Sequence, residues 1–205
     1  MSQASYVYRE KKGSDAKAPL LFLFHGTGGD EDQLFDLGSR LMPDAHLIPV
    51  RGDVSEHGAL RFFRRLGEGR YDMADLAVRT DKLATFIAAH LGADRPAAVY
   101  GLGYSNGANI LASVMFTEPA LFDAAVLMHP LIPFTPPPAP GLAGRRILIT
   151  AGRRDPMAPA ATTEALADYF SRQGTLVTTH WHEGGHELRP DELVAAQQLL
   201  AGATV

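Results

Sequence analysis

Short apolar runs alternate along this chain with longer segments in which apolar residues recur at helical spacing. Residues 20–24 are apolar throughout, which is typical of a strand covered on both faces. Further strands are predicted at 46–50, 97–100, 124–128, 145–151 and 175–181. Strands and helices that alternate in this way predict a mostly parallel central sheet with helices on both faces.

The predicted helices lie between these strands. The clearest covers residues 72–91, where Leu76, Leu83 and Ile87 recur at helical spacing and Gly92 stands where a glycine commonly ends a helix. Other helices are predicted at 30–42, after residue 107, at 159–172 and at 190–200. The remaining segments are a predicted edge strand at 5–10, an irregular segment at 51–70 and a proline-rich connection at 130–144.

Composition is that of a globular protein and excludes several other classes. The 205 residues are 46% hydrophobic and 20% charged, as expected for one domain spanning residues 1–205. The net charge of −4 offers no basic surface for nucleic acid, and no apolar run is long enough for membrane insertion. The polar first nineteen residues lack the core of a signal peptide, so we expect a cytoplasmic protein. The sequence leaves the oligomeric state open, a homodimer included.

One tight turn carries the most specific chemical signal. The strand at 97–100 leads into Gly-x-Ser-x-Gly at 103–107, and helical spacing begins immediately afterwards. A strand, a turn and a helix in this order raise the hydroxyl of Ser105 above the sheet, with the first helical N–H groups aimed at the same point. Such a serine is held in a sparsely allowed backbone conformation that costs about 1–3 kcal/mol. The turn therefore predicts a nucleophile.

A nucleophilic serine needs a base, and the base needs an acid that fixes its tautomer. The carboxyl ends of parallel strands gather at one edge of a sheet, which brings the loops after other strands to Ser105. Asp155 and His186 lie on such loops and complete the chain order Ser, Asp, His. The backbone N–H groups of Thr27 and Asn106 are the predicted donors to the oxyanion.

Other histidines compete for the role of base. His25, inside the glycine loop at 25–29, is expected to brace the backbone. His129 lies between the serine and the aspartate and so falls outside the expected order, which leaves His182 as the serious competitor to His186. Asp155 could instead cap the helix that follows, although Pro159 is the better helix start.

Two motifs point to cofactors and are weaker. Residues 182–186 match H-E-x-x-H, a zinc-protease signature that requires a helix, and two adjacent glycines disfavour a helix there by about 2 kcal/mol. The glycine patterns at 26–31 and 101–106 lack the third glycine of a dinucleotide site. We therefore expect neither a metal nor an organic cofactor.

Taken together, the segments 24–29, 103–109, 152–156 and 185–187 resemble the α/β-hydrolase superfamily, in particular its small carboxylesterase, phospholipase and acyl-thioesterase branch. The resemblance implies Ser105 as nucleophile, Asp155 as acid, His186 as base, and Thr27 and Asn106 as oxyanion donors. Many relatives carry Gln or His where this chain has Asn106, a change that leaves the backbone N–H in place. Residues 61–66 are similar to a bacterial subgroup, some of whose members are linked to aromatic or quinone stress.

The expected activity is hydrolysis of a carboxylic ester with a short to medium acyl or aryl group through an acyl-enzyme. Residues 130–144 are too few for a large cap domain, so we expect an open site whose apolar walls are Phe62, Phe63, Leu131 and Met157. The alternatives are an acyl thioesterase or lysophospholipase of the same fold, or a non-catalytic protein that binds a small molecule.

Overall fold

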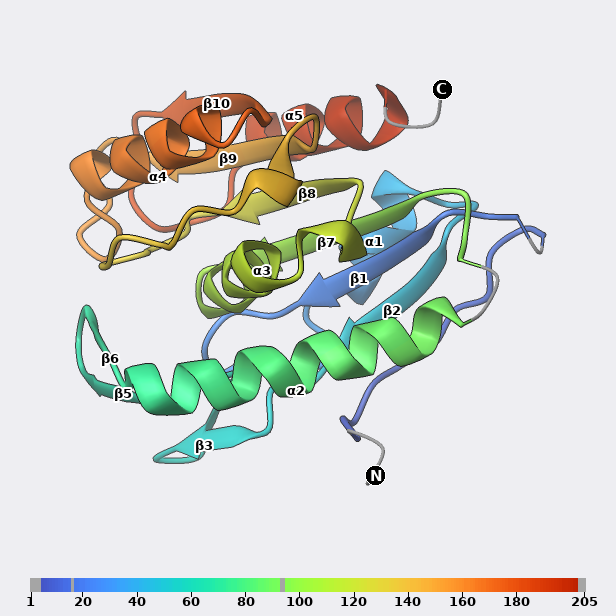
Figure 1. Ribbon diagram of the computed structural model, residues 1–205, viewed down its shortest axis with the longest axis horizontal. Helices are drawn as coiled ribbons and strands as arrows, with labels where there is room; N and C mark the ends of the chain where they lie inside the picture. Colours follow the sequence, from blue (N-terminus) through green and yellow to red (C-terminus); the bar gives the residue numbers. More distant parts are fainter. Residues whose placement is uncertain (1–4, 16, 93–94, 203–205) are drawn as a thin grey trace.

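Six parallel strands form the central sheet in the order β10-β9-β8-β7-β1-β2 (Figure 1). The computed structural model describes residues 5–15, 17–92 and 95–202, and the expectations for residues 1–4 lie outside this range. The strands of this sheet are β1 (Leu20–Phe24), β2 (His46–Val50), β7 (Val99–Tyr104), β8 (Ala124–Met128), β9 (Arg146–Gly152) and β10 (Leu176–His182). The predicted parallel sheet is confirmed, and β7, which leads to Ser105, lies near its centre.

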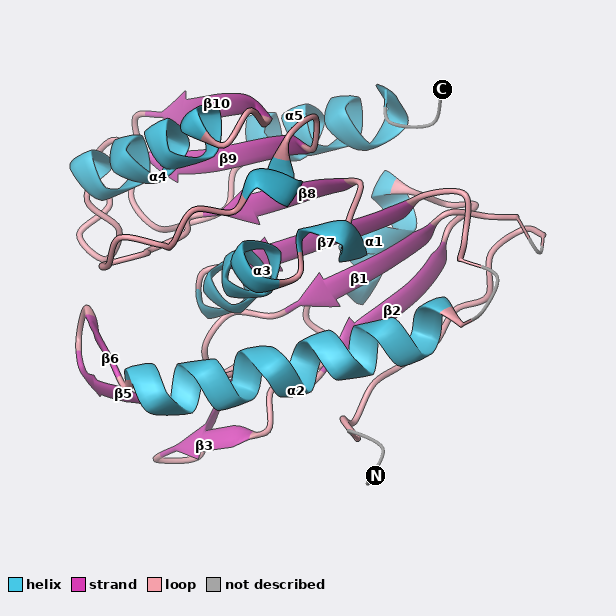
Figure 2. Cartoon of the chain, viewed as in Figure 1, coloured by secondary structure: helices cyan, strands magenta, loops and turns pink. Residues whose placement is uncertain are grey.

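Helices cover both faces of the sheet (Figure 2). One face is covered by α2 (Met73–Leu91), α3 (Asn106–Thr117) and α4 (Ala160–Arg172), and the other by α1 (Phe35–Leu41) and α5 (Pro190–Gly202). Alternate residues of each strand serve the two layers: Phe22 and Phe24 pack with the first group of helices, whereas Leu21 and Leu23 pack with the second. This explains why the strands are apolar throughout.

Three predicted segments differ from the structure. Residues 54–71, expected to be irregular, form two small hairpins, β3 (Val54–Glu56) with β4 (Ala59–Arg61) and β5 (Arg65–Gly67) with β6 (Arg70–Tyr71). Their strands are too short to show alternation in the sequence. Residues 5–11 form only isolated bridges to β2 instead of an edge strand, and α1 begins at Phe35 after a series of turns instead of at residue 30.

The connection after β8 crosses the sheet without forming a cap domain. It runs without regular secondary structure to the 3₁₀ turn η2 (Pro140–Leu142), and a similar turn, η1 (Pro119–Leu121), follows α3. Side chains of β6 and α4 hold it: the Tyr71 hydroxyl donates to the Leu131 carbonyl, and the Tyr169 hydroxyl to the Pro137 carbonyl at 2.7 Å. The site beyond β7 therefore stays open.

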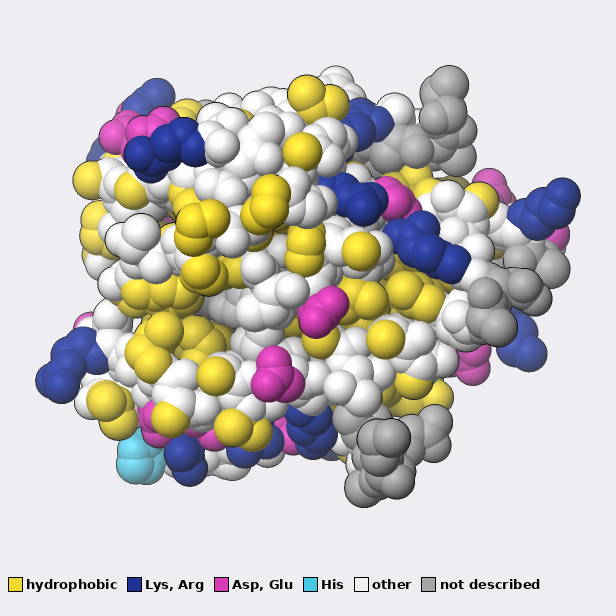
Figure 3. Space-filling model, viewed as in Figure 1, with side chains coloured by type: hydrophobic (Ala, Val, Ile, Leu, Met, Phe, Trp, Pro, Cys, Tyr) yellow, Lys and Arg dark blue, Asp and Glu magenta, His cyan; other side chains and the backbone are white. Residues whose placement is uncertain are grey.

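The outer surface of the α2, α3 and α4 layer is shown in Figure 3. Apolar side chains gather there around a shallow groove of about 260 Å³, lined among others by Met73, Phe116 and Phe134. None of the residues that line this groove also lines the cavity at Ser105. Within the described ranges, no helix has the length and apolar character needed to cross a bilayer.

Candidate active site

Ser105 stands at the apex of the turn between β7 and α3, with φ +51° and ψ −114°. A β-carbon at Gly103 would lie 2.5 Å from the Gly107 carbonyl oxygen, and one at Gly107 would lie 2.0 Å from the Phe24 carbonyl oxygen. Both positions therefore admit only glycine, because backbone approaches too closely for any side chain. The N–H of Ser105 donates to the Met128 carbonyl at 2.8 Å and helps to hold the strained conformation.

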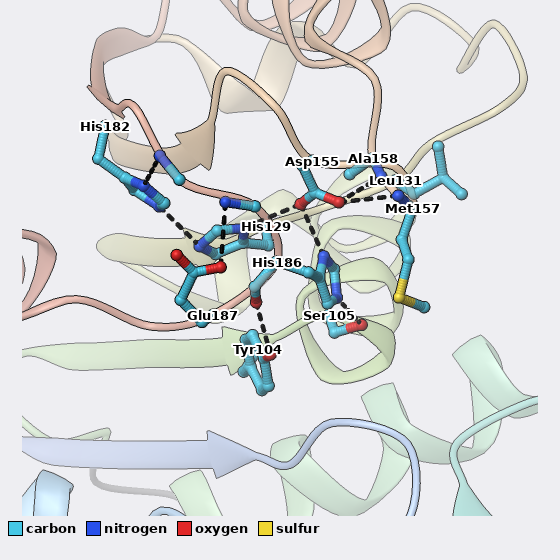
Figure 4. Close-up of polar contacts among 12 residues, drawn as sticks. Tyr104, Ser105, His129, Leu131, Asp155, Met157, Ala158, His182, His186 and Glu187 are labelled. Atoms are coloured by element: carbon cyan, nitrogen blue, oxygen red, sulfur yellow. Dashed lines mark hydrogen bonds and ion pairs between the residues drawn. The ribbon is translucent and has the colours of Figure 1, made fainter.

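His186 bridges Ser105 and Asp155, as Figure 4 shows. Its Nε2 lies 2.8 Å from Ser105 Oγ, and its Nδ1 lies 2.7 Å from Asp155 Oδ2. Because the carboxylate only accepts, Nδ1 carries the proton and Nε2 is left to accept the proton of the serine hydroxyl. The Tyr104 hydroxyl donates to the His186 carbonyl at 2.7 Å and fixes the backbone of this loop. The three side chains thus meet from three separate loops.

Asp155 accepts four hydrogen bonds through its two carboxylate oxygens. Oδ1 accepts from the N–H groups of Met157 and Ala158, at 2.8 and 3.0 Å, while Oδ2 accepts from His186 and His129. Burial alone raises the pKa of Asp155, but these four hydrogen bonds outweigh it and lower the pKa. Asp155 therefore stabilises the turn before α4 through Oδ1 and contacts His186 through Oδ2 at the same time.

His129 is a further functional candidate, although it falls outside the chain order Ser, Asp, His. It follows β8 directly, with φ +51° and a fully buried side chain. Its Nδ1 lies 3.0 Å from Asp155 Oδ2 and its Nε2 lies 2.9 Å from Glu192 Oε1. Since both ring nitrogens face carboxylates, both carry protons and His129 is an imidazolium cation. The one feature of the sequence that pointed to a role for His129 in the site is its position directly after a predicted strand.

The charge of His129 has a clear physical origin. Burial lowers the pKa of His129, but hydrogen bonds to Glu192 and Asp155 outweigh that effect and raise the pKa. Glu192, in the first turn of α5, is fully buried, and its Oε2 also accepts from the N–H of Arg189 at 2.6 Å. The cluster of Asp155, His129 and Glu192 therefore holds two anions and one cation.

His182, the competing base, belongs to this buried cluster and does not face Ser105. Its Nδ1 accepts from the N–H of Gly184 at 2.9 Å, so the proton lies on Nε2, which is 3.4 Å from both His129 Nε2 and Glu192 Oε2. The ligand atoms of His129, His182 and Glu192 lie within 4.8 Å of one another, which is close enough to hold a metal ion, so the expected absence of a metal stays a prediction. The residues after His182 form bends, not the helix that the H-E-x-x-H interpretation requires.

The backbone N–H groups at the two predicted oxyanion positions belong to residues that line the cavity with Ser105. Among the described residues, the N–H groups of Thr27 and Asn106 have no hydrogen-bond partner. His25 braces the Thr27 loop as expected: its Nδ1 lies 2.7 Å from the Gly26 carbonyl oxygen, and its Nε2 accepts from the N–H of Gly52 at 2.9 Å. Asn106 accepts from the N–H of Phe62 at 2.7 Å through its side chain.

A cavity of about 630 Å³ opens above Ser105 and His186. Leu131 and Met157 line it, as predicted, whereas the structure places Phe62 and Phe63 in the core, 1% and 0% exposed. Both residues lie in the bend between β4 and β5, where the Phe62 ring packs against Phe24 and the Phe63 ring packs against Tyr71. The wall is also more polar than expected, because Arg61, Arg65, Asn109 and Thr162 contribute to it.

Comparisons with known proteins found similar hydrolases. The chain is 42% identical over 202 residues to the Bacillus subtilis (strain 168) protein "Putative hydrolase MhqD", covering 98% of this chain and 99% of that protein. The crystal structure of a Bacillus cereus carboxylesterase superposes with a TM-score of 0.92 at 37% identity, covering 98% and 96% of the two chains.

Two further solved structures are similar over nearly their whole length. A carboxylesterase from Mesorhizobium loti has a TM-score of 0.87 at 31% identity, covering 98% of this chain and 96% of that one. The protein Atu2452 of unknown function from Agrobacterium tumefaciens str. C58 has a TM-score of 0.91 at 53% identity, covering 99% of each chain. No protein-family model matches the sequence. The fold, the elbow and these relatives show that the chain belongs to the carboxylesterase and thioesterase branch of the α/β-hydrolase superfamily.

Proposed function

We propose that this hydrolase cleaves carboxylic esters through an acyl-enzyme on Ser105, with His186 as the base and Asp155 as the acid. The observation that carries the proposal is the position of His186, whose two ring nitrogens lie 2.8 Å from Ser105 Oγ and 2.7 Å from Asp155 Oδ2. The carboxylesterases among the similar structures support the same class of substrate.

In the first half-reaction, Ser105 Oγ attacks the ester carbonyl carbon while its proton passes to His186 Nε2. The carbonyl oxygen becomes an oxyanion, which the N–H groups of Thr27 and Asn106 are oriented to bind. Collapse of this intermediate breaks the bond to the alcohol, which leaves with the proton from His186. Water then repeats the sequence on the acyl-enzyme and releases the acid, so that Ser105 regains its proton.

The buried cluster behind Asp155 suits a base that must become charged. Asp155, His129 and Glu192 together carry one net negative charge, since His129 is held as a cation between two carboxylates. When His186 accepts the serine proton, its positive charge neutralises this excess. In a dry site, such a fixed compensating charge stabilises the transition state without the cost of reorganising water.

Covalent labelling tests the proposal. A fluorophosphonate should add one mass increment to the intact protein and none to Ser105→Ala, and the same substitution should lower kcat for p-nitrophenyl acetate by about 10⁴-fold or more. An unlabelled wild-type protein would favour a binding protein that retained the fold. A graded panel of acyl esters, acyl-CoA thioesters and lysophospholipids then separates a carboxylesterase from the thioesterase and lysophospholipase alternatives.

A further inference from the structure

Arg61 presents an incompletely paired cation to the cavity that contains Ser105. It ends β4, is only 5% exposed, and lines the cavity together with Thr27. Its Nη1 donates to Thr27 Oγ1 at 2.7 Å, and its Nε donates to the Phe63 carbonyl at 3.3 Å. Among the described residues, no hydrogen bond reaches Nη2. Since Arg61 lines the cavity and Nη2 is not among the buried atoms that lack a partner, this donor is accessible to a bound anion.

The protein supplies less negative charge than this corner of the cavity requires. The nearest carboxylate, Glu56, lies 3.5 Å from Arg61 Nη1, but both of its oxygens also accept from Arg65 Nε at 3.0 Å. One carboxylate is thus shared between two arginines that both line the cavity. The other acidic residue on the wall, Glu68, is exposed to solvent and forms no ion pair with either arginine within the described residues. Of the acidic residues that the structure describes, Glu56 alone therefore pairs with both arginines, and Arg61 has the longer of the two contacts.

We propose that the natural ester carries a carboxylate, and that Arg61 binds this group inside the cavity. The inference rests on the proposed function and deepens it, replacing the uncharged substrate that apolar walls alone would predict. A planar guanidinium matches a carboxylate in shape and binds it through charge-assisted hydrogen bonds. Because Arg61 donates to the side chain of Thr27, the proposed oxyanion donor, a carboxylate bound by Arg61 would lie a few bonds from the reacting carbonyl.

Matched pairs of esters test the charge preference on each side of the reacting bond. The acyl side is tested with mono-p-nitrophenyl adipate against its methyl ester, and the alcohol side with para-acetoxybenzoate against para-acetoxybenzamide. In the wild-type enzyme, kcat/KM should favour the carboxylate in at least one pair. Arg61→Met should lower that ratio by about 10- to 100-fold, the usual value of a hydrogen-bonded charge.

The neutral ester of each pair reports how much active enzyme every variant retains, so the ratio is independent of folding yield. Arg64→Gln is the matched control: Arg64 is 61% exposed, pairs with Asp72 and does not line the cavity, so the ratio should not change. Glu56→Gln should raise the ratio, because it removes the competing carboxylate. A ratio of one or less in both pairs, or one that Arg61→Met leaves unchanged, overturns the proposal.

Binding separates this inference from the proposed function. In the Ser105→Ala variant, titration calorimetry should show a lower Kd for para-acetoxybenzoate than for para-acetoxybenzamide. Adding Arg61→Met should abolish this difference in Kd. If wild-type protein neither turns over the neutral esters nor reacts with a fluorophosphonate, the proposed function fails while this measurement still decides the carboxylate site. If the fluorophosphonate labels the protein but Arg61→Met leaves the difference in Kd unchanged, only the proposed carboxylate site is wrong.

Discussion

The two sides of Asp155 present the same chemical group in opposite surroundings. On the cavity side, His186 is partly exposed and offers one nitrogen to Ser105 (Figure 4). On the interior side, His129 is fully buried and has a carboxylate at each nitrogen, Asp155 at one and Glu192 at the other. Both histidines use Nδ1 to reach the same oxygen, Asp155 Oδ2. The difference lies at Nε2, where His186 meets a hydroxyl and His129 meets Glu192.

This contrast shows what makes a histidine suitable as a base. A base needs an unprotonated nitrogen within reach of the substrate or nucleophile, and His129 has both nitrogens protonated and enclosed. His129 instead fixes the charge and position of Asp155. Both histidines therefore contact the aspartate, and they differ in the partner of Nε2, on which their proposed roles depend.

The largest effect should come from the cavity side. We expect His186→Ala to lower kcat for a neutral aryl ester by about 10⁴-fold or more, because no other group can accept the serine proton. The unfolding midpoint in urea should change little, since His186 is partly exposed. Loss of activity accompanied by loss of cooperative unfolding would contradict the separation of roles.

A change on the interior side should affect both stability and activity. His129→Gln leaves Asp155 and Glu192 as buried, uncompensated carboxylates, which should lower the free energy of unfolding by about 3–5 kcal/mol. Misplacement of Asp155 should lower kcat by about 10²-fold, measured at a temperature where the variant is folded. The matched control is His180→Gln on the same strand as His182: His180 pairs with Asp191 at the surface, and its loss should cost at most about 1 kcal/mol. Equal effects for His129 and His180 would remove the distinction.

The pH dependence of stability should sharpen the comparison further. The pKa of His129 is raised above its ordinary 6.5 because Glu192 and Asp155 outweigh burial, and the neighbouring His182, His186 and Tyr104 complete its surroundings. A group whose pKa is raised on folding adds stability that is complete below the unfolded value and is lost as pH rises through the folded value. Urea titrations at several pH values from about 6 to 9 should show this decline in wild-type protein and a flatter curve in His129→Gln. Parallel curves would argue against a charged His129.

The smallest expected effect concerns the support of His186. Tyr104→Phe removes the hydrogen bond from the tyrosine hydroxyl to the His186 carbonyl and should lower the free energy of unfolding by about 1 kcal/mol. Because the loop still carries its other backbone bonds, kcat should fall only several-fold. A loss as large as that of His186→Ala would assign the hydroxyl a direct part in the reaction.

The fold and the positions of Ser105, Asp155 and His186 at loops of one sheet edge could be predicted because each depends on local sequence. The apolar strands, the two close-packed glycines and the loops after β9 and β10 all lie within short segments, and parallel topology brings their ends together. Glu192 could not be found in this way. An acidic residue in the first turn of a helix usually serves the helix dipole, and nothing local to it indicates a partner 63 residues away.

The cavity wall was predicted less well for a related reason. From the sequence, the apolar residues of segment 60–63 could face either the core or the cavity. In the structure, Arg61 at the end of β4 lines the cavity, and Phe62 and Phe63, which follow it, are buried in the core. Short hairpins carry too few residues for alternation to reveal which face is buried. The wall therefore became polar where an apolar surface was expected.

The long separation between His129 and Glu192 has a consequence for protein synthesis. Ser105, His129 and Asp155 all leave the ribosome before α5, which carries Glu192 and packs against β8 and β9. Until that helix docks, a nascent chain holds His129 against one carboxylate instead of two, and the compensating charge behind Asp155 is missing. Synthesis thus delivers Ser105, the proposed nucleophile, before the helix that completes the charge behind Asp155.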